Sequence, residues 1–139
     1  MPTTSRPTDS SAPVAASHPR MPAAAMFVLD VVCVVIFAVA GRSSHGGVHG
    51  VADVAGVAWP FLVALVVGWM IVGGTRRDAP RTLGDGVIVY VATLAGGMLL
   101  RGATGGGTAT AFILVAAGFL GATLLGWRVL ARRSLRRQA

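Results

Sequence analysis

The sequence contains no lysine, no glutamate and no asparagine, and it has a single cysteine. One cysteine excludes an intrachain disulfide. Because Cys33 lies within an apolar run, we expect it to pack as a small hydrophobic residue and to support no redox chemistry. Charged side chains of any kind make up only 12% of the 139 residues. Soluble domains carry about twice that share, so this scarcity of charge excludes an ordinary soluble fold.

What the chain has in abundance is hydrophobic residues, at 54% of the total, and its mean hydropathy is +0.71. These residues gather into four apolar stretches, at about 23–41, 54–73, 83–100 and 108–128. Each stretch approaches the roughly 20 helical residues that span a bilayer. Backbone groups in lipid must bond internally, which favours helices. The sequence therefore predicts an all-α membrane protein whose four transmembrane helices occupy residues 23–130.

The two ends of the chain differ from this middle. Residues 1–22 hold five of the seven prolines, which predicts a disordered tail, and residues 131–139 form a short basic tail. One alternative concerns Ala38-Val39-Ala40, which is similar to the cleavage site of a signal peptide. Cleavage there would leave three helices. The long segment before the apolar run and the nearby Asp30 argue against cleavage.

Arginine supplies all twelve basic residues and predicts the orientation. Ten of them lie in the two tails, at the end of the last helix and in the connection after the second helix, whereas only Arg42 and Arg101 lie in the other two connections. The positive-inside rule then places both termini in the cytoplasm. Residue usage rich in Ala, Gly, Val and Arg is typical of GC-rich bacteria, so we expect a multi-pass protein of the bacterial cytoplasmic (inner) membrane. The net charge of +7 is then explained by lipid headgroups, and we expect no nucleic-acid partner.

Two segments are similar to one another at an offset of 58 residues. Residues 61–69 and 119–127 share Phe, Leu, Ala, Gly and Trp in register, and Arg42 corresponds to Arg101 at an offset of 59. These matches predict two tandem helical hairpins related by an axis along the membrane normal. The alternative is chance similarity, because a few small and aliphatic residues dominate the whole sequence.

Polar residues near the predicted outer rim form the first candidate site: Arg42, His45, His49 and Arg101. Two guanidinium groups could bind a phosphate or carboxylate, or they could simply reach lipid headgroups. His45, His49 and Asp53 follow one another at a spacing of four, which on a helix would put three potential metal ligands on one face. The glycines among them disfavour a helix and no Cys, Glu or other His completes the site, so we predict no metal site and no cofactor. A pH-responsive or hydrogen-bonding role of the histidines is favoured instead.

Asp30 is the one acid firmly within an apolar stretch. A carboxylate in lipid costs at least about 2.5 kcal/mol, so we expect it to face the bundle and contact Arg128, with proton or ion relay as an alternative. Small residues recur at a spacing of four and predict close helix packing. They are Gly118, Ala122 and Gly126 on the fourth helix, and Ala92 with Gly96 on the third.

No catalytic triad, nucleophile elbow or carboxylate pair is present, so we identify no catalytic residues and do not expect an enzyme. Six short motifs resemble the DUF3054 family of uncharacterised bacterial membrane proteins over about residues 27–133. They are Gly41-Arg42-Ser-Ser-His45, Trp59-Pro60-Phe61, Gly68-Trp69, Gly97-Met-Leu-Leu-Arg101-Gly102, Gly107-Thr108 with Phe112, and Gly126-Trp127-Arg128. The resemblance implies a four-helix membrane protein and no mechanism.

Two classes of function remain open from the sequence. The first is a small carrier or permease-like protein that acts as a homo-oligomer and uses the outer polar residues. The second is a non-catalytic scaffold or accessory subunit that binds another membrane protein. In both, the lipid bilayer is the surrounding partner.

Overall fold

The structure, a computed structural model, describes residues 21–43 and 50–136, and these form four α-helices without any strand. The helices are α1 (Ala23–Ser43), α2 (Val51–Arg76), α3 (Leu83–Ala103) and α4 (Thr110–Arg136). Each of the four is long and apolar enough to cross a membrane. The chain is therefore a four-helix, multi-pass membrane protein, as the apolar stretches predicted.

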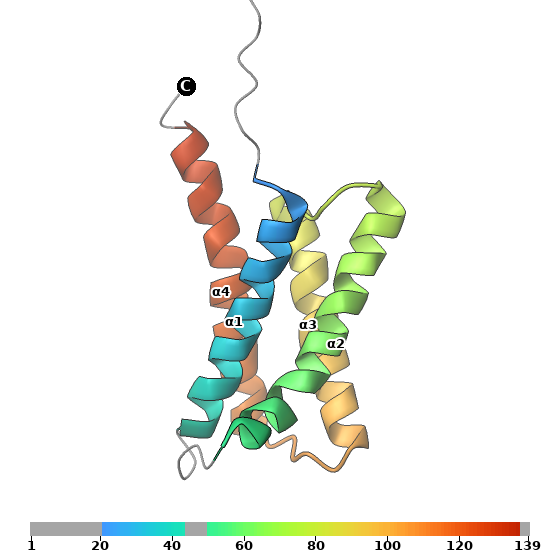
Figure 1. The fold of residues 1–139 in the computed structure, drawn as a ribbon, viewed down its shortest axis with the longest axis vertical. Coiled ribbons are helices and arrows are strands. Elements are labelled where there is room, and N and C mark those ends of the chain that lie inside the picture. Colours follow the sequence, from blue (N-terminus) through green and yellow to red (C-terminus); the bar gives the residue numbers. More distant parts are fainter. Residues whose placement is uncertain (1–20, 44–49, 137–139) are drawn as a thin grey trace, which may run out of the picture.

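The helices run alternately up and down and are arranged as a ring (Figure 1). Each helix contacts its two neighbours in the order α1, α2, α3, α4 and back to α1, and no diagonal pair within the described chain is in extensive contact. We call the end where α1 begins and α4 ends the terminal end. The opposite end, where α1 ends and α2 begins, is the distal end.

Helix boundaries differ from the predicted stretches mainly at their ends. Helix α4 continues to Arg136, so part of the expected basic tail extends the last helix. Helix α2 already begins at Val51, which places Pro60 in its interior. Figure 1 shows α2 changing direction in this part of the helix. The missing N–H of a proline and the crowding of its ring against the preceding turn account for such a bend.

Large apolar side chains fill the middle of the bundle. Phe37, Phe61, Leu65, Leu120 and Leu124 are completely buried. Phe37 of α1 lies between the two corresponding phenylalanines of the internal similarity, with ring centroids 5.2 Å from Phe61 and 5.9 Å from Phe119. Outward-facing residues such as Met70 and Leu114 are equally apolar and well exposed, as expected of surfaces that contact lipid.

The four contacts around the ring are unequal. Helices α1 and α2 contact each other to about the same extent as α3 and α4, which is compatible with two similar hairpins, although the duplication stays a prediction. The contact between α2 and α3 is the largest of the four, and that between α1 and α4 is the smallest. We call these two contacts the α2–α3 seam and the α1–α4 seam.

Candidate functional site

A fully buried carboxylate, Asp30, lies near the terminal end of the bundle. Oδ1 of Asp30 accepts hydrogen bonds from Nε1 of Trp127 at 2.9 Å and from Nη1 of Arg128 at 3.0 Å. Its Oδ2 accepts from Nε1 of Trp69 at 3.0 Å and from Nη2 of Arg128 at 2.8 Å. We call these four residues the terminal clamp. A carboxylate has about four acceptor positions, so the carboxylate of Asp30 is saturated.

Arg128, the cation of the clamp, is only 1% exposed. Besides the two hydrogen bonds to Asp30, its Nε donates to the carbonyl of Pro80 at 3.2 Å and its Nη1 donates to the carbonyl of Leu124 at 2.7 Å. Its Cζ lies 4.4 Å from the ring centroid of Trp127. A buried ion pair is stable only when such additional bonds compensate for lost hydration, and here they do.

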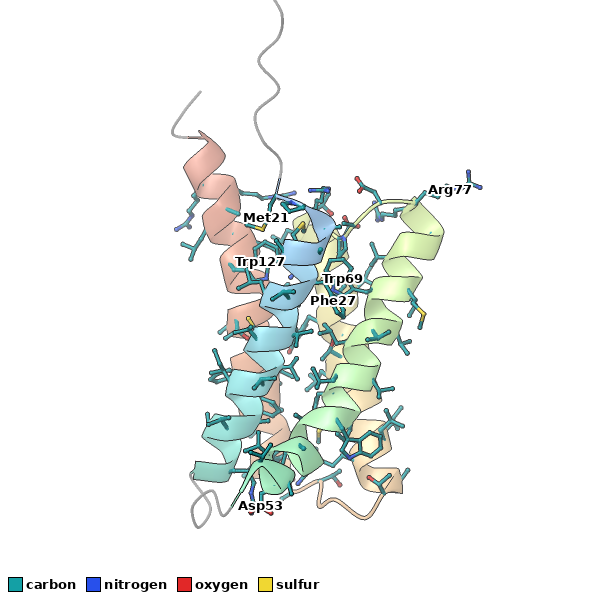
Figure 2. The ribbon with its side chains drawn as sticks, in the orientation of Figure 1. Met21, Phe27, Asp53, Trp69, Arg77 and Trp127 are labelled. Carbon is teal, nitrogen blue, oxygen red and sulfur yellow. The ribbon has the colours of Figure 1, made fainter. Side chains whose placement is uncertain are left out.

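Both tryptophans of the clamp come from the two similar segments of the sequence. Interfacial belts are the usual place for tryptophan in membrane proteins. Here the indole N–H groups of Trp69 and Trp127 point inward, to opposite oxygens of one carboxylate. Figure 2 shows both residues near the terminal end, with Phe27 beside Trp69. The rings of Phe27 and Trp69 pack edge to face at 5.2 Å. Sequence reasoning missed this role, and the repeated Gly-Trp pair was the signal for it.

Helix α3 reaches the clamp through a glycine. A Cβ atom on Gly86 would lie 2.6 Å from Cδ of Arg128, so only glycine lets the α3 backbone pass this side chain. At the residue before Gly86, Nε of Arg76 lies 2.9 Å from Oδ1 of Asp85, and Thr82 and Asp85 form a capping box at the start of α3. The terminal end therefore carries two interhelical ion pairs, one buried and one half exposed.

The chemistry of the clamp is structural. The structure brings together Asp30 and Arg128, the pair that the sequence analysis expected to be in contact. Each oxygen of the Asp30 carboxylate accepts two hydrogen bonds from the protein, and a proton or ion relay through this acid stays a prediction. Among the described residues, the clamp holds no nucleophile beside a base.

Arg42 and Arg101, the outer arginines of the sequence analysis, lie at the distal end. Nη2 of Arg42 lies 3.1 Å from Oδ2 of Asp53, in the first turn of α2. Figure 2 shows Asp53 at this end of the bundle. Nε of Arg101 donates to the carbonyl of Gly107 at 2.9 Å, and its Cζ lies 4.5 Å from the centroid of Phe112.

Next to these arginines, the α1–α4 seam opens into an apolar groove of about 310 Å³. Its lining is almost entirely hydrocarbon and comes from the last turns of α1 and the first turns of α4. The lining residues are Phe37, Ala40, Gly41, Ala111, Phe112, Val115 and Phe119. We call them the distal groove.

His45 and His49, the other two members of the predicted rim site, lie outside the described residues. Within residues 21–43 and 50–136, no group of three or more His, Cys, Asp and Glu side chains is placed to bind a metal ion. The prediction about the two histidines therefore stays a prediction.

The small residues that were expected to pack divide into two groups. On α3, Gly96 and Ala92 face α2, because a Cβ on Gly96 would lie 3.0 Å from Cβ of Ala64 and one on Gly68 would lie 3.1 Å from Cβ of Ala92. On α4, Gly118 has open space around it and Ala122 is exposed. Gly126 also has open space where a Cβ would stand. The α4 residues therefore make no close helix contact within the described part of the chain.

Comparisons with known proteins give one result. A family model described as "Protein of unknown function (DUF3054)" matches residues 27–131, which include α2, α3, most of α1 and α4, both arginines of the distal end and the terminal clamp. No curated protein and no solved structure matches the chain.

Proposed function

The chain belongs to the DUF3054 family of proteins of unknown function, and from this premise we propose that it is a small, carrier-like membrane protein that binds a lipid-like molecule in the distal groove. The proposal is for a non-catalytic binding protein in the bacterial cytoplasmic membrane. The single observation that carries it is the groove itself, an apolar hollow of about 310 Å³ in a seam that is tightly held at its other end.

The lining and the size of the groove favour a hydrocarbon chain as ligand. Ligand pockets are mostly apolar, with volumes of about 300–1,000 Å³, so this one suits part of a single chain better than a bulky molecule. Gly41 supports this interpretation, because it has open space where a side chain would lie.

A pathway through the middle of one chain is not favoured. Phe37, Phe61 and Leu120 are completely buried at the centre of the bundle, and the polar atoms of Asp30 and Arg128 are bonded to protein. Transport of a polar solute would therefore need a surface supplied by a second copy. We therefore propose that the carrier-like protein binds an amphiphile at the α1–α4 seam. A permease for polar solutes would require an oligomer.

Native mass spectrometry of the purified protein, combined with photocrosslinking, tests the proposal. The probe is a fatty acid carrying a diazirine at mid-chain, added to protein in neutral detergent. We expect retained lipid at a fixed ratio and crosslinks concentrated on the distal halves of α1 and α4. The same spectrum reports the oligomeric state.

Two matched glycine variants supply the control. Gly41→Phe places a ring in the groove, whereas Gly56→Phe places the same ring on the exposed distal part of α2, where there is also open space. We expect Gly41→Phe to abolish the focused crosslinking and Gly56→Phe to leave it unchanged. Labelling spread evenly over all lipid-facing helices in the unaltered protein would contradict the proposal.

A scaffold or accessory subunit is the second candidate, and one observation favours it. The small residues Gly118 and Ala122 of α4 face outward, where another membrane helix could approach closely. Affinity capture in mild detergent tests this candidate. We expect a stoichiometric membrane partner that is lost from a Gly118→Ile/Ala122→Ile variant, and the absence of such a partner would argue against it.

A further inference from the structure

We propose that the distal end binds an anionic headgroup, a singly charged phosphate or carboxylate attached to the hydrocarbon chain in the distal groove. The ligand is thus an anionic amphiphile with its head between Arg42 and Arg101. The inference rests on the proposed function and names the class of ligand that the groove takes.

Charge is the first argument. Among the described residues, the distal end carries two guanidinium groups, Arg42 and Arg101, and one carboxylate, Asp53. One positive charge is therefore left without a counter-ion. An anion placed between two cations gains a favourable interaction with each of them, and these offset any repulsion between the cations. The excess of one charge matches a head with a single negative charge.

Both arginines of the distal end keep N–H donors that bond to no described residue. Nε of Arg101 is bonded to the carbonyl of Gly107, but its Nη1 and Nη2 donate to no other described residue. Nε of Arg42 is buried and has no hydrogen-bond partner among the described residues, while Nη2 of the same side chain is held by Asp53. Guanidinium groups bind phosphate and carboxylate oxygens through paired N–H donors, and Nη1 with Nη2 of Arg101 offers such a pair, whereas Arg42 contributes its positive charge.

The two arginines adjoin the residues that line the distal groove. Gly41 lines the groove and directly precedes Arg42 in α1. The guanidinium of Arg101 lies over the ring of Phe112, which forms part of the groove wall on α4. A single molecule with an apolar chain and an anionic head could therefore occupy both features together. A hydrocarbon without a headgroup would occupy only the groove, and a free anion would contact only the arginines.

Binding of lysolipids that share one acyl chain tests the inference. Delipidated protein in neutral detergent is titrated, with native mass spectrometry as readout, against lysophosphatidylglycerol, lysophosphatidylcholine and glycerol phosphate. We expect the anionic lysolipid to bind about tenfold more tightly than the zwitterionic one, the equivalent of one charge-assisted hydrogen bond. Glycerol phosphate, which represents a free phosphate, should bind far more weakly than either.

Variants assign the preference to the two arginines. Arg101→Gln, which breaks no ion pair within the described chain, should bring the ratio between the two lysolipids close to one, and adding Arg42→Gln, which leaves Asp53 without its cation, should bring the ratio below one. Binding of lysophosphatidylcholine should persist in both variants, which shows that the groove is folded. Arg132→Gln/Arg133→Gln removes the same charge from exposed positions on α4 and should leave the ratio unchanged.

Other outcomes separate the two proposals. Equal binding of both lysolipids to the unaltered protein would overturn the headgroup site and leave the groove proposal standing. The headgroup site would also be overturned if the Arg132→Gln/Arg133→Gln variant lost the preference for the anionic lysolipid as fully as Arg101→Gln does. Positive charge anywhere on the protein would then be sufficient to cause that preference. If glycerol phosphate bound as tightly as the anionic lysolipid, the ligand would be a free phosphate. If neither lysolipid bound, both proposals would fail.

Discussion

The α2–α3 seam and the α1–α4 seam use different means to hold two membrane helices together. In the α2–α3 seam, small residues let the backbones approach: a Cβ on Gly68 would lie 3.2 Å from Cα of Val89, and one on Gly97 would lie 2.3 Å from the ring of Phe61. In the α1–α4 seam, a buried ion pair fixes the terminal end, and a groove separates the helices at the distal end.

The difference shows how a small bundle can be both stable and open. Van der Waals packing between small residues acts along the whole length of a seam and leaves no space in it. A saturated ion pair holds two helices at one point, so the helices need not pack closely along the rest of the seam. The distal groove therefore lies in the seam that depends least on close packing.

The largest expected effect comes from breaking the ion pair of the α1–α4 seam. Asp30→Ala leaves Arg128 buried without its carboxylate, and we expect a loss of about 3–5 kcal/mol in the free energy of unfolding, measured by titration with sodium dodecyl sulfate in mixed micelles. Asp30→Leu/Arg128→Met, which removes both charges, should recover most of that loss. A single variant as stable as the unaltered protein would show that the clamp does not hold this seam.

The tryptophans of the clamp should come next, with equal effects. Trp69→Phe and Trp127→Phe each remove one hydrogen bond to the Asp30 carboxylate, so we expect each to lose about 1.5–3 kcal/mol in the same unfolding assay. Trp59→Phe is the control, because Trp59 is 42% exposed and should change stability by less than about 0.5 kcal/mol. A large effect at only one of the two clamp positions would mean that the carboxylate is held from one side.

The α2–α3 seam should be sensitive to a single methyl group. Gly97→Ala directs a Cβ into the buried ring of Phe61, and we expect a loss of about 1–3 kcal/mol from overpacking. Gly126→Ala on α4 meets open space and should be neutral or slightly stabilising. Equal effects of the two substitutions, measured by the same titration, would show that the close approach at Gly97 does not limit the packing of the α2–α3 seam.

The smallest effect should come from the ion pair of the α2–α3 seam. The side chain of Arg76 is 57% exposed, so Arg76→Gln should lose less than about 1 kcal/mol. Asp85→Ala should cost more, because Asp85 also completes the capping box with Thr82. A larger effect for Arg76→Gln than for Asp85→Ala would show that the ion pair, and not the cap, stabilises the start of α3.

Much of the fold follows from the sequence because lipid restricts the alternatives. Four apolar stretches of bilayer length can form only helices, and an acid among them needs a buried cation, which led to Asp30 and Arg128. Other features were visible only in the three-dimensional structure and not in the sequence pattern. The inward turn of Trp69 and Trp127, the approach of Gly86 to Arg128, and the outward position of Gly118 depend on how each helix is rotated about its axis.

The question of signal cleavage gains a physical argument from the clamp. Cleavage after Ala40 would remove Asp30 and Phe37 together with most of α1. Arg128 would then stay among buried side chains without its carboxylate, and the core would lose a completely buried phenylalanine. The packing of this structure therefore favours a protein that keeps its first helix. The mass of the protein isolated from membranes would check it.

The separation in sequence between Asp30 and Arg128 also has a consequence for biosynthesis. Asp30 enters the membrane with the first helix, and its partner follows 98 residues later with the last. Chains grow at about 5–20 residues per second, so the carboxylate waits for several seconds before its counter-ion emerges. During that interval the first three helices carry an unpaired intramembrane acid, and insertion of α4 ends it. The clamp thus marks the completed chain, and a truncated product would display to membrane proteases an acid that the full protein conceals.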